Sequence, residues 1–349
     1  MSATVPAAEL VYPRPAPPPP GGLAEIAPGV LWLRLALPFQ LDHVNVYLIE
    51  DGPGWAVLDT GVADLRTRTV WESVLAERLR GRPLTRLIVT HYHPDHVGLA
   101  GWLTDRFGLE LSMSQTEFLF CQNMRHNPAA LGAAAHRDFY RQRGVDAAAI
   151  DSIMGRGHGY TKLTTELPPV YRRLIAGEHL RIGGRDFEIL SGGGHAPEQV
   201  MLLNRDEGLF LAADQVLARI TPNIGVWPWE PQADPLSDYL RSLAELRRQV
   251  PDDVLALPAH NLPFYGLHQR LADLERHHAL RCAEIATACT AAPRTVAEVL
   301  PVLFPRALDA HQTGFAFGEV LAHVNYMLHR GEVAMVTDAA GIQRIRRVE

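Results

Sequence analysis

Three histidines and an aspartate fall within six residues at the point where an apolar run of strand length, Leu84–Val89, ends. The motif has the pattern H-x-H-x-D-H and consists of His91, His93, Asp95 and His96. After it, an amphipathic pattern predicts a helix that ends at Gly108, and Asp95 stands where an acidic side chain can cap this helix. The motif therefore occupies a strand-to-helix turn at the carboxyl edge of a sheet, where ligands of α/β proteins bind.

Three further candidate metal ligands follow strand-like runs: His195, Asp214 and His260. Glycines precede His195, and they let the backbone approach a ligand closely. Taken singly, His195 fits a loop histidine, Asp214 a helix N-cap, and His260 a core histidine. Imidazole nitrogen and carboxylate oxygen suit a divalent transition metal. The matching positions of the three residues therefore favour a metal site, and the short spacings in the turn can serve two neighbouring metals.

Strand-like and helical patterns alternate through residues 23–265, which predicts an α/β domain. Within it, strand-like runs at 44–51 and 55–61 flank the turn sequence GPG and predict a hairpin. Residues 113–172 show several short helical patterns and no convincing strand, so we expect a helical insertion there. Residues 1–22 are rich in proline and predict a flexible arm outside the core.

Residues 266–349 predict a separate C-terminal unit with one long helical pattern, two shorter ones and a final pair of strand-like runs. Helices followed by a β-hairpin resemble a small winged-helix unit. The candidate recognition helix, residues 315–331, carries one arginine and one glutamate. We therefore expect this unit to serve packing or dimerisation, with a homodimer left open, rather than to read nucleic acid.

Composition excludes several other classes of protein. With 47% hydrophobic and 21% charged residues, the 349-residue chain is that of an ordinary globular protein. A net charge of −6 argues against a surface that holds a polyanion, so the expected partner is a small-molecule substrate. The cysteines are scattered without a C-x-x-C pair, which indicates neither a disulfide framework nor a thiolate metal site. No apolar run has the length of a membrane span, and the start lacks a signal-peptide pattern, so we expect a cytoplasmic protein without a membrane partner.

The H-x-H-x-D-H motif, followed in order by His195, Asp214 and His260, resembles the metallo-β-lactamase superfamily over roughly residues 29–264. The resemblance implies a four-layer αββα sandwich with two divalent metals, most often zinc, with iron or manganese as alternatives. It also implies which residues bind each metal. The first metal would be held by His91, His93 and His195, the second by Asp95, His96 and His260, and both by the bridging Asp214. The sequence LDTG matches a further family motif, in which Asp59 supports the site from behind the ligands.

A bridging aspartate without a cysteine ligand is similar to the glyoxalase II, lactonase and ribonuclease Z side of the superfamily. The implied activity is that of a dinuclear-metal hydrolase that attacks an electrophilic carbonyl, in a thioester, ester, lactone or β-lactam, with a hydroxide bridging the metals. Asp95 or Asp214 would pass a proton to the leaving group. Two alternatives stay open: a phosphodiesterase or ribonuclease of the same superfamily, and a persulfide dioxygenase with one iron.

Aromatic residues in two segments are candidates for the substrate pocket. Those in the expected insertion either roof the metals or pack a helical subdomain: Phe118, Phe120, Phe139, Tyr140 and Tyr160. His158 is a candidate polar contact or a surface histidine. Trp227 and Trp229 follow Asp214 and are expected near the metals, either as pocket lining or in the core.

Overall fold

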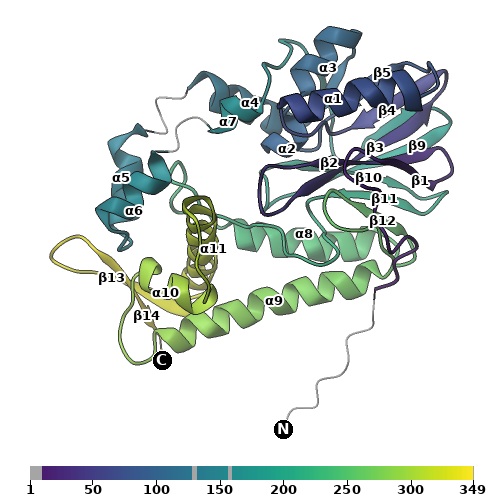
Figure 1. The fold of residues 1–349 in the computed structure, drawn as a ribbon. Coiled ribbons are helices and arrows are strands. Elements are labelled where there is room, and N and C mark those ends of the chain that lie inside the picture. Colours follow the sequence, from purple (N-terminus) through teal and green to yellow (C-terminus); the bar gives the residue numbers. More distant parts are fainter. Residues whose placement is uncertain (1–9, 128–131, 156–158, 349) are drawn as a thin grey trace.

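The computed structural model describes residues 10–127, 132–155 and 159–348. Two sheets form its centre (Figure 1). The larger, in spatial order, contains β1 (Leu23–Ala27), β2 (Val30–Ala36), β3 (His43–Asp51), β4 (Gly54–Leu58), β5 (Leu84–Ile88), β6 (Leu111–Met113) and β7 (Arg172–Arg173). The smaller contains β12 (Leu255–Pro258), β11 (Leu209–Ala213), β10 (Gln199–Asn204), β9 (Arg185–Gly192) and β8 (His179–Ile182). The expected hairpin is confirmed by the antiparallel pairing of β3 with β4.

Alternating side chains give the larger sheet two apolar faces. Trp32 pairs across the strands with Tyr47, and both belong to the core that lies between the sheets. The next pair, Leu33 with Val46, belongs to the core on the outer face, which includes Trp71. Both faces of the central strands are therefore buried, as a sheet covered on each side requires.

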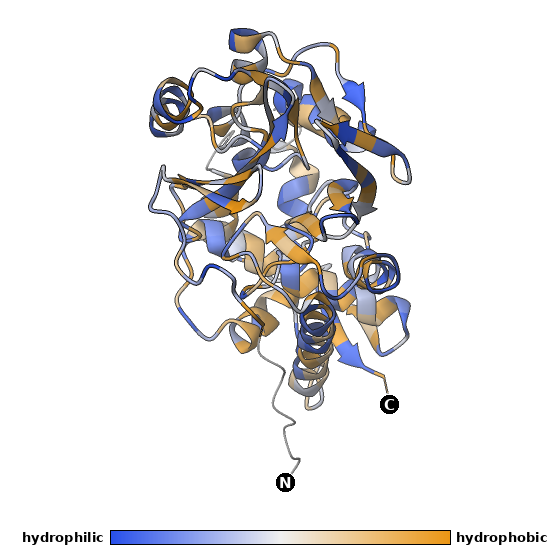
Figure 2. Cartoon of the chain, turned by 90° about the vertical axis from the view of Figure 1, so that its right-hand side faces the viewer, coloured by the Kyte–Doolittle hydropathy of each residue, from blue (hydrophilic) through white to orange (hydrophobic). Residues whose placement is uncertain are grey.

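Helices cover the outer faces and complete four layers, helix–sheet–sheet–helix (Figure 1). On the larger sheet lie α1 (Leu65–Ser73), a π-helical turn (Val74–Arg78), α2 (Pro94–Val97) and α3 (Ala100–Phe107). On the smaller lie α8 (Pro235–Gln249) and α9 (Leu267–Ala288). Hydrophobic and hydrophilic residues are interspersed along these helices (Figure 2), as expected for helices with one buried side. The predicted helix end is confirmed at Gly108, which takes a left-handed conformation with φ 62°.

The described part of the segment between β6 and β7 is mostly helical, with a non-helical stretch at 164–171. It holds α4 (Gln115–His126), α5 (Ala134–Arg141), α6 (Ala147–Met154) and α7 (Gly159–Leu163). Helices α4 and α7 contact each other, and α7 also contacts α2 beside the histidine motif. Helices α5 and α6 instead pack on the C-terminal part of the chain, because the apolar side of α5 joins the core around Phe317.

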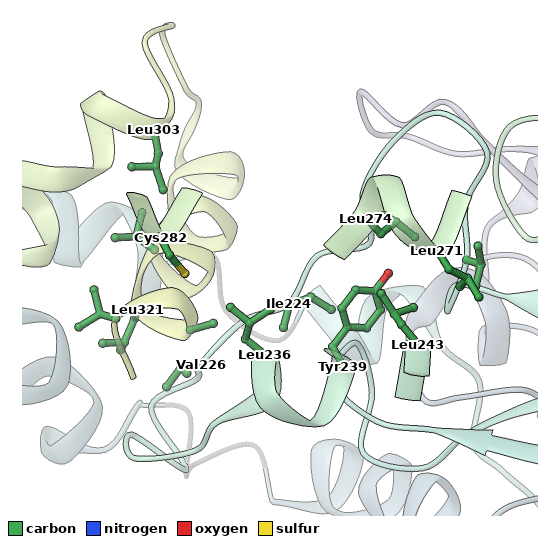
Figure 3. Close-up of a cluster of buried hydrophobic side chains, with 14 of the residues drawn as sticks. Ile224, Val226, Leu236, Tyr239, Leu243, Leu271, Leu274, Cys282, Leu303 and Leu321 are labelled. Carbon is green, nitrogen blue, oxygen red and sulfur yellow. The ribbon is translucent and has the colours of Figure 1, made fainter. Parts of the chain in front are cut away.

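The C-terminal part adds α10 (Val296–Leu303), α11 (Ala310–His329) and an antiparallel hairpin of β13 (Val333–Thr337) and β14 (Gln343–Arg347). Helix α11 is shorter than α9, as expected, but only slightly, since it spans 20 residues against 22. Much of α11 is buried between α6, α8, α9 and α10. Figure 3 shows Leu321 of α11 in the same apolar cluster as Leu236 of α8 and Cys282 of α9. Helix α11 is therefore a core helix and not an exposed recognition helix.

The described part of the expected proline-rich arm, residues 10–22, is attached to the rest of the chain at two points. Val11 and Tyr265 form a backbone bridge, with N···O distances of 3.3 and 2.9 Å. Near the other end, the Gly21 N–H donates to the Arg34 carbonyl at 2.7 Å. Within the described part of the chain, no helix is both long and apolar enough to cross a membrane.

Candidate metal centre

The structure brings all seven proposed ligands together at one end of the two sheets. The H-x-H-x-D-H motif spans the turn after β5 and continues into α2, so it lies at a strand-to-helix turn as its flanking patterns predict. His195 lies in the loop after β9, Asp214 directly follows β11, and His260 follows β12. His93, not Asp95, takes the N-cap position of α2, and Asp95 lies in the first turn. Its side chain is therefore available to the cluster, where it lies with His96 and His260.

Three histidines form the first group of ligand atoms. Nε2 of His91 lies 2.9 Å from Nδ1 of His93, which lies 3.0 Å from Nε2 of His195. Nitrogens that share one tetrahedral zinc at about 2.0–2.1 Å lie about 3.3 Å apart. The three nitrogens therefore have nearly the spacing that a single metal ion imposes.

The second group consists of Asp95, His96 and His260. Oδ2 of Asp95 lies 3.6 Å from Nε2 of His96 and 3.4 Å from Nε2 of His260. Asp214 lies between the two groups, because its Oδ2 is 3.2 Å from Nε2 of His195 and 3.3 Å from Nε2 of His260. This is the position that a ligand shared by two metals would take.

Unpartnered atoms test whether a metal fits this site. Nε2 of His96 and Oδ1 of Asp214 are buried and have no hydrogen-bond partner in the described structure. A buried polar atom without a partner costs about 1–3 kcal/mol, and a metal ion removes that cost by accepting its lone pair. The imidazole and carboxylate donors suit zinc, iron or manganese. The residues therefore fit a metal site.

The electrostatics around His91, His93 and Asp214 also suit metal binding. Burial and then the neighbouring histidines hold the pKa of His91 well below its ordinary range. Burial and then His195 lower the pKa of His93 to about 3. Both imidazoles are therefore neutral and offer lone pairs to a cation. Burial raises the pKa of Asp214, but the nearby His260 and His96 outweigh burial and hold this pKa well below its ordinary range. The carboxylate of Asp214 is therefore ionised.

Each of three ligand histidines is oriented through its Nδ1 atom. The Nδ1 of His96 lies 2.8 Å from Oδ2 of Asp59, as the resemblance implied. Nδ1 of His195 lies 2.9 Å from the Asn223 carbonyl, and Nδ1 of His260 lies 2.7 Å from the His43 carbonyl. With Nδ1–H donating in each case, Nε2 is left free for the metal.

Sequence reasoning missed Asn223 and His43, because both act through backbone carbonyls that leave no mark on residue type. It also missed Glu117, a buried residue of α4. Its carboxylate accepts from the Tyr92 N–H at 2.9 Å and from the Glu198 N–H at 2.7 Å. Burial raises the pKa of Glu117 to about 7. Glu117 thus connects the turn that holds the motif to the loop that holds His195.

The aromatic residues of the helical segment lie in three places. Phe120 lies 4.5 Å, centroid to centroid, from Tyr92, and the Tyr160 hydroxyl donates to the Tyr92 carbonyl at 2.9 Å, so both lie beside the motif. Phe139 and Tyr140 instead pack against Phe317, so of the two alternatives these residues follow packing and do not roof the metals. Phe118 stacks on Tyr171 in the core of the larger sheet. His158 lies outside the described residues.

An αββα sandwich that gathers histidines and aspartates able to hold metal ions at the ends of its strands is typical of one class of metal-dependent hydrolases. The family model "Metallo-beta-lactamase superfamily" matches residues 40–260, and the chain belongs to this superfamily. A second model, "Metallo-beta-lactamase-like, C-terminal domain", matches residues 282–348.

Similar proteins cover nearly the whole chain. A β-lactamase domain protein from Burkholderia ambifaria is 38% identical, with a TM-score of 0.89 over 97% of this chain and 98% of that one. A metallo-β-lactamase family protein from Thermus thermophilus is 28% identical, with a TM-score of 0.77 over 93% of this chain and 100% of that one. "Probable metallo-hydrolase YqjP" of Bacillus subtilis is 24% identical over 311 residues, which are 85% of this chain and 92% of that protein. The C-terminal unit is therefore shared with the structures from Burkholderia and Thermus.

Proposed function

We propose that this chain is a dinuclear-metal hydrolase of electrophilic carbonyl compounds: thioesters, esters, lactones or β-lactams. The observation that carries the proposal is the place of Asp214, whose Oδ2 lies within 3.6 Å of Nε2 of His96, His195 and His260. A carboxylate so placed is a ligand common to both histidine groups. The donor sets contain no cysteine, which favours the glyoxalase II and lactonase branch over the zinc β-lactamases.

The roles of the residues follow from the two groups. His91, His93 and His195 would hold one metal, Asp95, His96 and His260 the other, and Asp214 both. Bound there, divalent metals supply a nucleophile derived from water at neutral pH and a Lewis acid for the carbonyl oxygen. No serine or cysteine nucleophile is required.

Asp95 is better placed than Asp214 to pass a proton to the leaving group. Its side chain is 16% exposed, against 7% for Asp214, so a substrate approaching from solvent meets Asp95 first. The Oδ2 of Asp95 also stays within 3.6 Å of two histidine nitrogens, which hold the carboxylate in one orientation.

We further propose that the C-terminal unit is a winged-helix-like element that packs against the hydrolase domain. Its order of helices followed by a hairpin supports this. The burial of α11 argues against nucleic-acid reading and thus against the phosphodiesterase or ribonuclease alternative.

The first experiment combines metal content with activity. Protein purified without chelator or metal-binding tag is analysed by plasma mass spectrometry and screened against thioesters, lactones and β-lactams. We expect about two zinc ions per chain and hydrolysis that Asp214→Ala abolishes. Asp206→Ala, at an exposed aspartate between β10 and β11, is the matched control and retains activity. One iron per chain would favour the dioxygenase instead, and cleavage of RNA alone would favour the ribonuclease.

A further inference from the structure

A row of aromatic side chains lies beside the metal cluster, and the proposed chemistry does not use it. Its members come from four separate segments: the connection between β2 and β3, α11, the connection after β11, and α4. The aromatic row consists of Phe39, His311, Phe315, Trp227, Trp229 and Phe120.

Consecutive rings of the row are in contact. Ring centroids lie 5.4 Å apart between Phe39 and His311, and 4.7 Å apart between His311 and Phe315. Phe315 lies 5.3 Å from Trp227, which stacks on Trp229 at 5.6 Å. Trp229 lies 5.8 Å from Phe120. All these distances fall within the range of favourable aromatic pairs, about 4.5–7 Å.

One end of the row is in contact with the candidate metal centre through Tyr92. At one end, Phe120 contacts Tyr92, whose ring lies 4.4 Å from the ring of the ligand His93. At the other end, Phe39 lies four residues before His43, whose carbonyl receives the Nδ1–H of the ligand His260. The row therefore begins beside the metal cluster and ends in the connection that leads into β3.

The middle of the row is also tied to the cluster. The Asn223 carbonyl orients the ligand His195, and Trp227 follows Asn223 in the same connection. In α11, the Gly318 carbonyl accepts from the Val226 N–H at 3.1 Å, which fixes this connection against the C-terminal unit. A Cβ at position 318 would lie 3.2 Å from the Val226 carbonyl oxygen, so glycine permits this close approach.

The row is partly open to solvent. Trp229 is 39% exposed, and the other five members are half-buried. Large apolar side chains gathered at the surface beside a reactive site are typical of ligand-binding surfaces. Tyr92, one ring further toward the metals, is buried. Apolar character is thus continuous from the surface to the ligands.

We propose that the aromatic row binds a bulky apolar acyl group of the substrate, so that the chain prefers long or bulky acyl esters and thioesters to acetyl ones. This inference rests on the proposed hydrolase function. Apolar atoms buried against the row lower the free energy of the bound substrate in proportion to the area removed from water. An acetyl group is too small to reach beyond the metals. Through His311 and Phe315, the C-terminal unit supplies part of the substrate site.

The test is a chain-length series of thioesters of one thiol, with acetyl, hexanoyl and decanoyl groups. We expect kcat/KM to rise at least about tenfold from acetyl to decanoyl. Trp229→Ala should remove most of that rise, because it lowers kcat/KM for the decanoyl thioester far more than for the acetyl thioester. Ile220→Ala is the matched control, because Ile220 is also 39% exposed and lies in the same connection outside the row.

Two results would overturn the proposal. One is equal kcat/KM for all three acyl groups in the wild type. The other is a uniform loss with every substrate in Trp229→Ala, which would make Trp229 a purely structural residue. The same thioester series is measured with Phe315→Ala, which changes a row member on α11. Two variants in different segments ensure that a folding defect of one does not decide the outcome.

A binding measurement separates failure of this inference from failure of the hydrolase function. Decanoate, with acetate as the control, is titrated while tryptophan fluorescence is recorded. In one outcome no thioester is cleaved, but decanoate changes the fluorescence of wild type and of Ile220→Ala and leaves that of Trp229→Ala unchanged. The row then binds apolar chains, and the hydrolase proposal fails. If thioesters are cleaved and decanoate binds no better than acetate, the hydrolase stands and the role of the row is refuted.

Discussion

The Nδ1 atom of His96 lies 2.8 Å from Oδ2 of Asp59, and both side chains are buried. The same carboxylate accepts from the Thr90 N–H at 2.8 Å and from the Thr90 hydroxyl at 2.9 Å. Asp59 has φ 65°, a left-handed conformation that few residues without a special role adopt. Asp59, directly after β4, thus has a left-handed conformation and orients a candidate metal ligand that follows the neighbouring strand β5.

Asp59→Asn is expected to weaken metal binding about 10–100-fold. The amide keeps the shape of the side chain but lacks the charge, and its NH2 group cannot accept the Nδ1–H of His96. Affinity is measured by competition with a chromophoric chelator. Asp64→Asn is the control, because Asp64 only caps α1 and asparagine caps equally well. Equal affinities of wild type and Asp59→Asn would contradict the orienting role.

The ligands were the most predictable part of the site. His91, His93, Asp95 and His96 are local in sequence, and an apolar strand pattern with a following helix places such a turn at the sheet edge. His195, Asp214 and His260 follow strand patterns in the same manner. The strand patterns before these residues carry this information, because strands of a sandwich end at common edges.

The surroundings of the site were far less predictable. Helices α4 and α5 both have an amphipathic pattern. Their periodicity therefore does not predict that Phe120 contacts Tyr92 while Phe139 packs on Phe317. The aromatic row joins Phe39 to Phe315, which are separated by most of the chain. Such contacts depend on how the C-terminal unit packs, and local patterns do not record that packing.

Gly101→Ala is expected to destabilise the fold by about 3 kcal/mol. A Cβ at Gly101 would lie 1.7 Å from the Glu166 carbonyl oxygen, so α3 or the segment after α7 must shift. That segment is held by the Thr165 N–H, which donates to the Gly98 carbonyl at 2.7 Å. Urea unfolding measures the loss. Gly184→Ala serves as the control, because no atom lies within 4 Å of its added Cβ. A similar loss of unfolding free energy in Gly184→Ala would refute the steric cause.

Glu319→Gln is expected to change how stability depends on pH. Glu319 of α11 faces Asn223, whose side-chain NH2 donates to Oε2 at 3.4 Å. Desolvation raises the pKa of Glu319 from 4.5 to about 7. Between these values the folded chain binds this proton more tightly than the unfolded chain, so the free energy of unfolding falls as pH rises through the window. The contribution of this bound proton to the free energy of unfolding is complete below pH 4.5 and lost above about pH 7.

Because glutamine does not titrate, the stability of Glu319→Gln relative to wild type should increase from pH 4.5 to 8 by on the order of 2 kcal/mol. Urea unfolding at several pH values provides the comparison. Glu332→Gln, at an exposed glutamate just after α11, should run parallel to wild type. A Glu319→Gln curve that also runs parallel to wild type would show that the folded chain does not hold this carboxyl in its neutral form.

Removal of metal is expected to lower the melting temperature by several degrees. Ligands that bind only the folded state stabilise it, by about 2.7 kcal/mol at 100 times the dissociation constant. Without metal, Nε2 of His96 and Oδ1 of Asp214 are left buried and unpartnered. Thermal unfolding is followed before and after dialysis against a chelator, and again after zinc is restored. Asp214→Ala should show a much smaller response than Asp206→Ala. If the chelated wild type has lost its metal but melts at an unchanged temperature, these buried atoms do not bind the metal in the folded state.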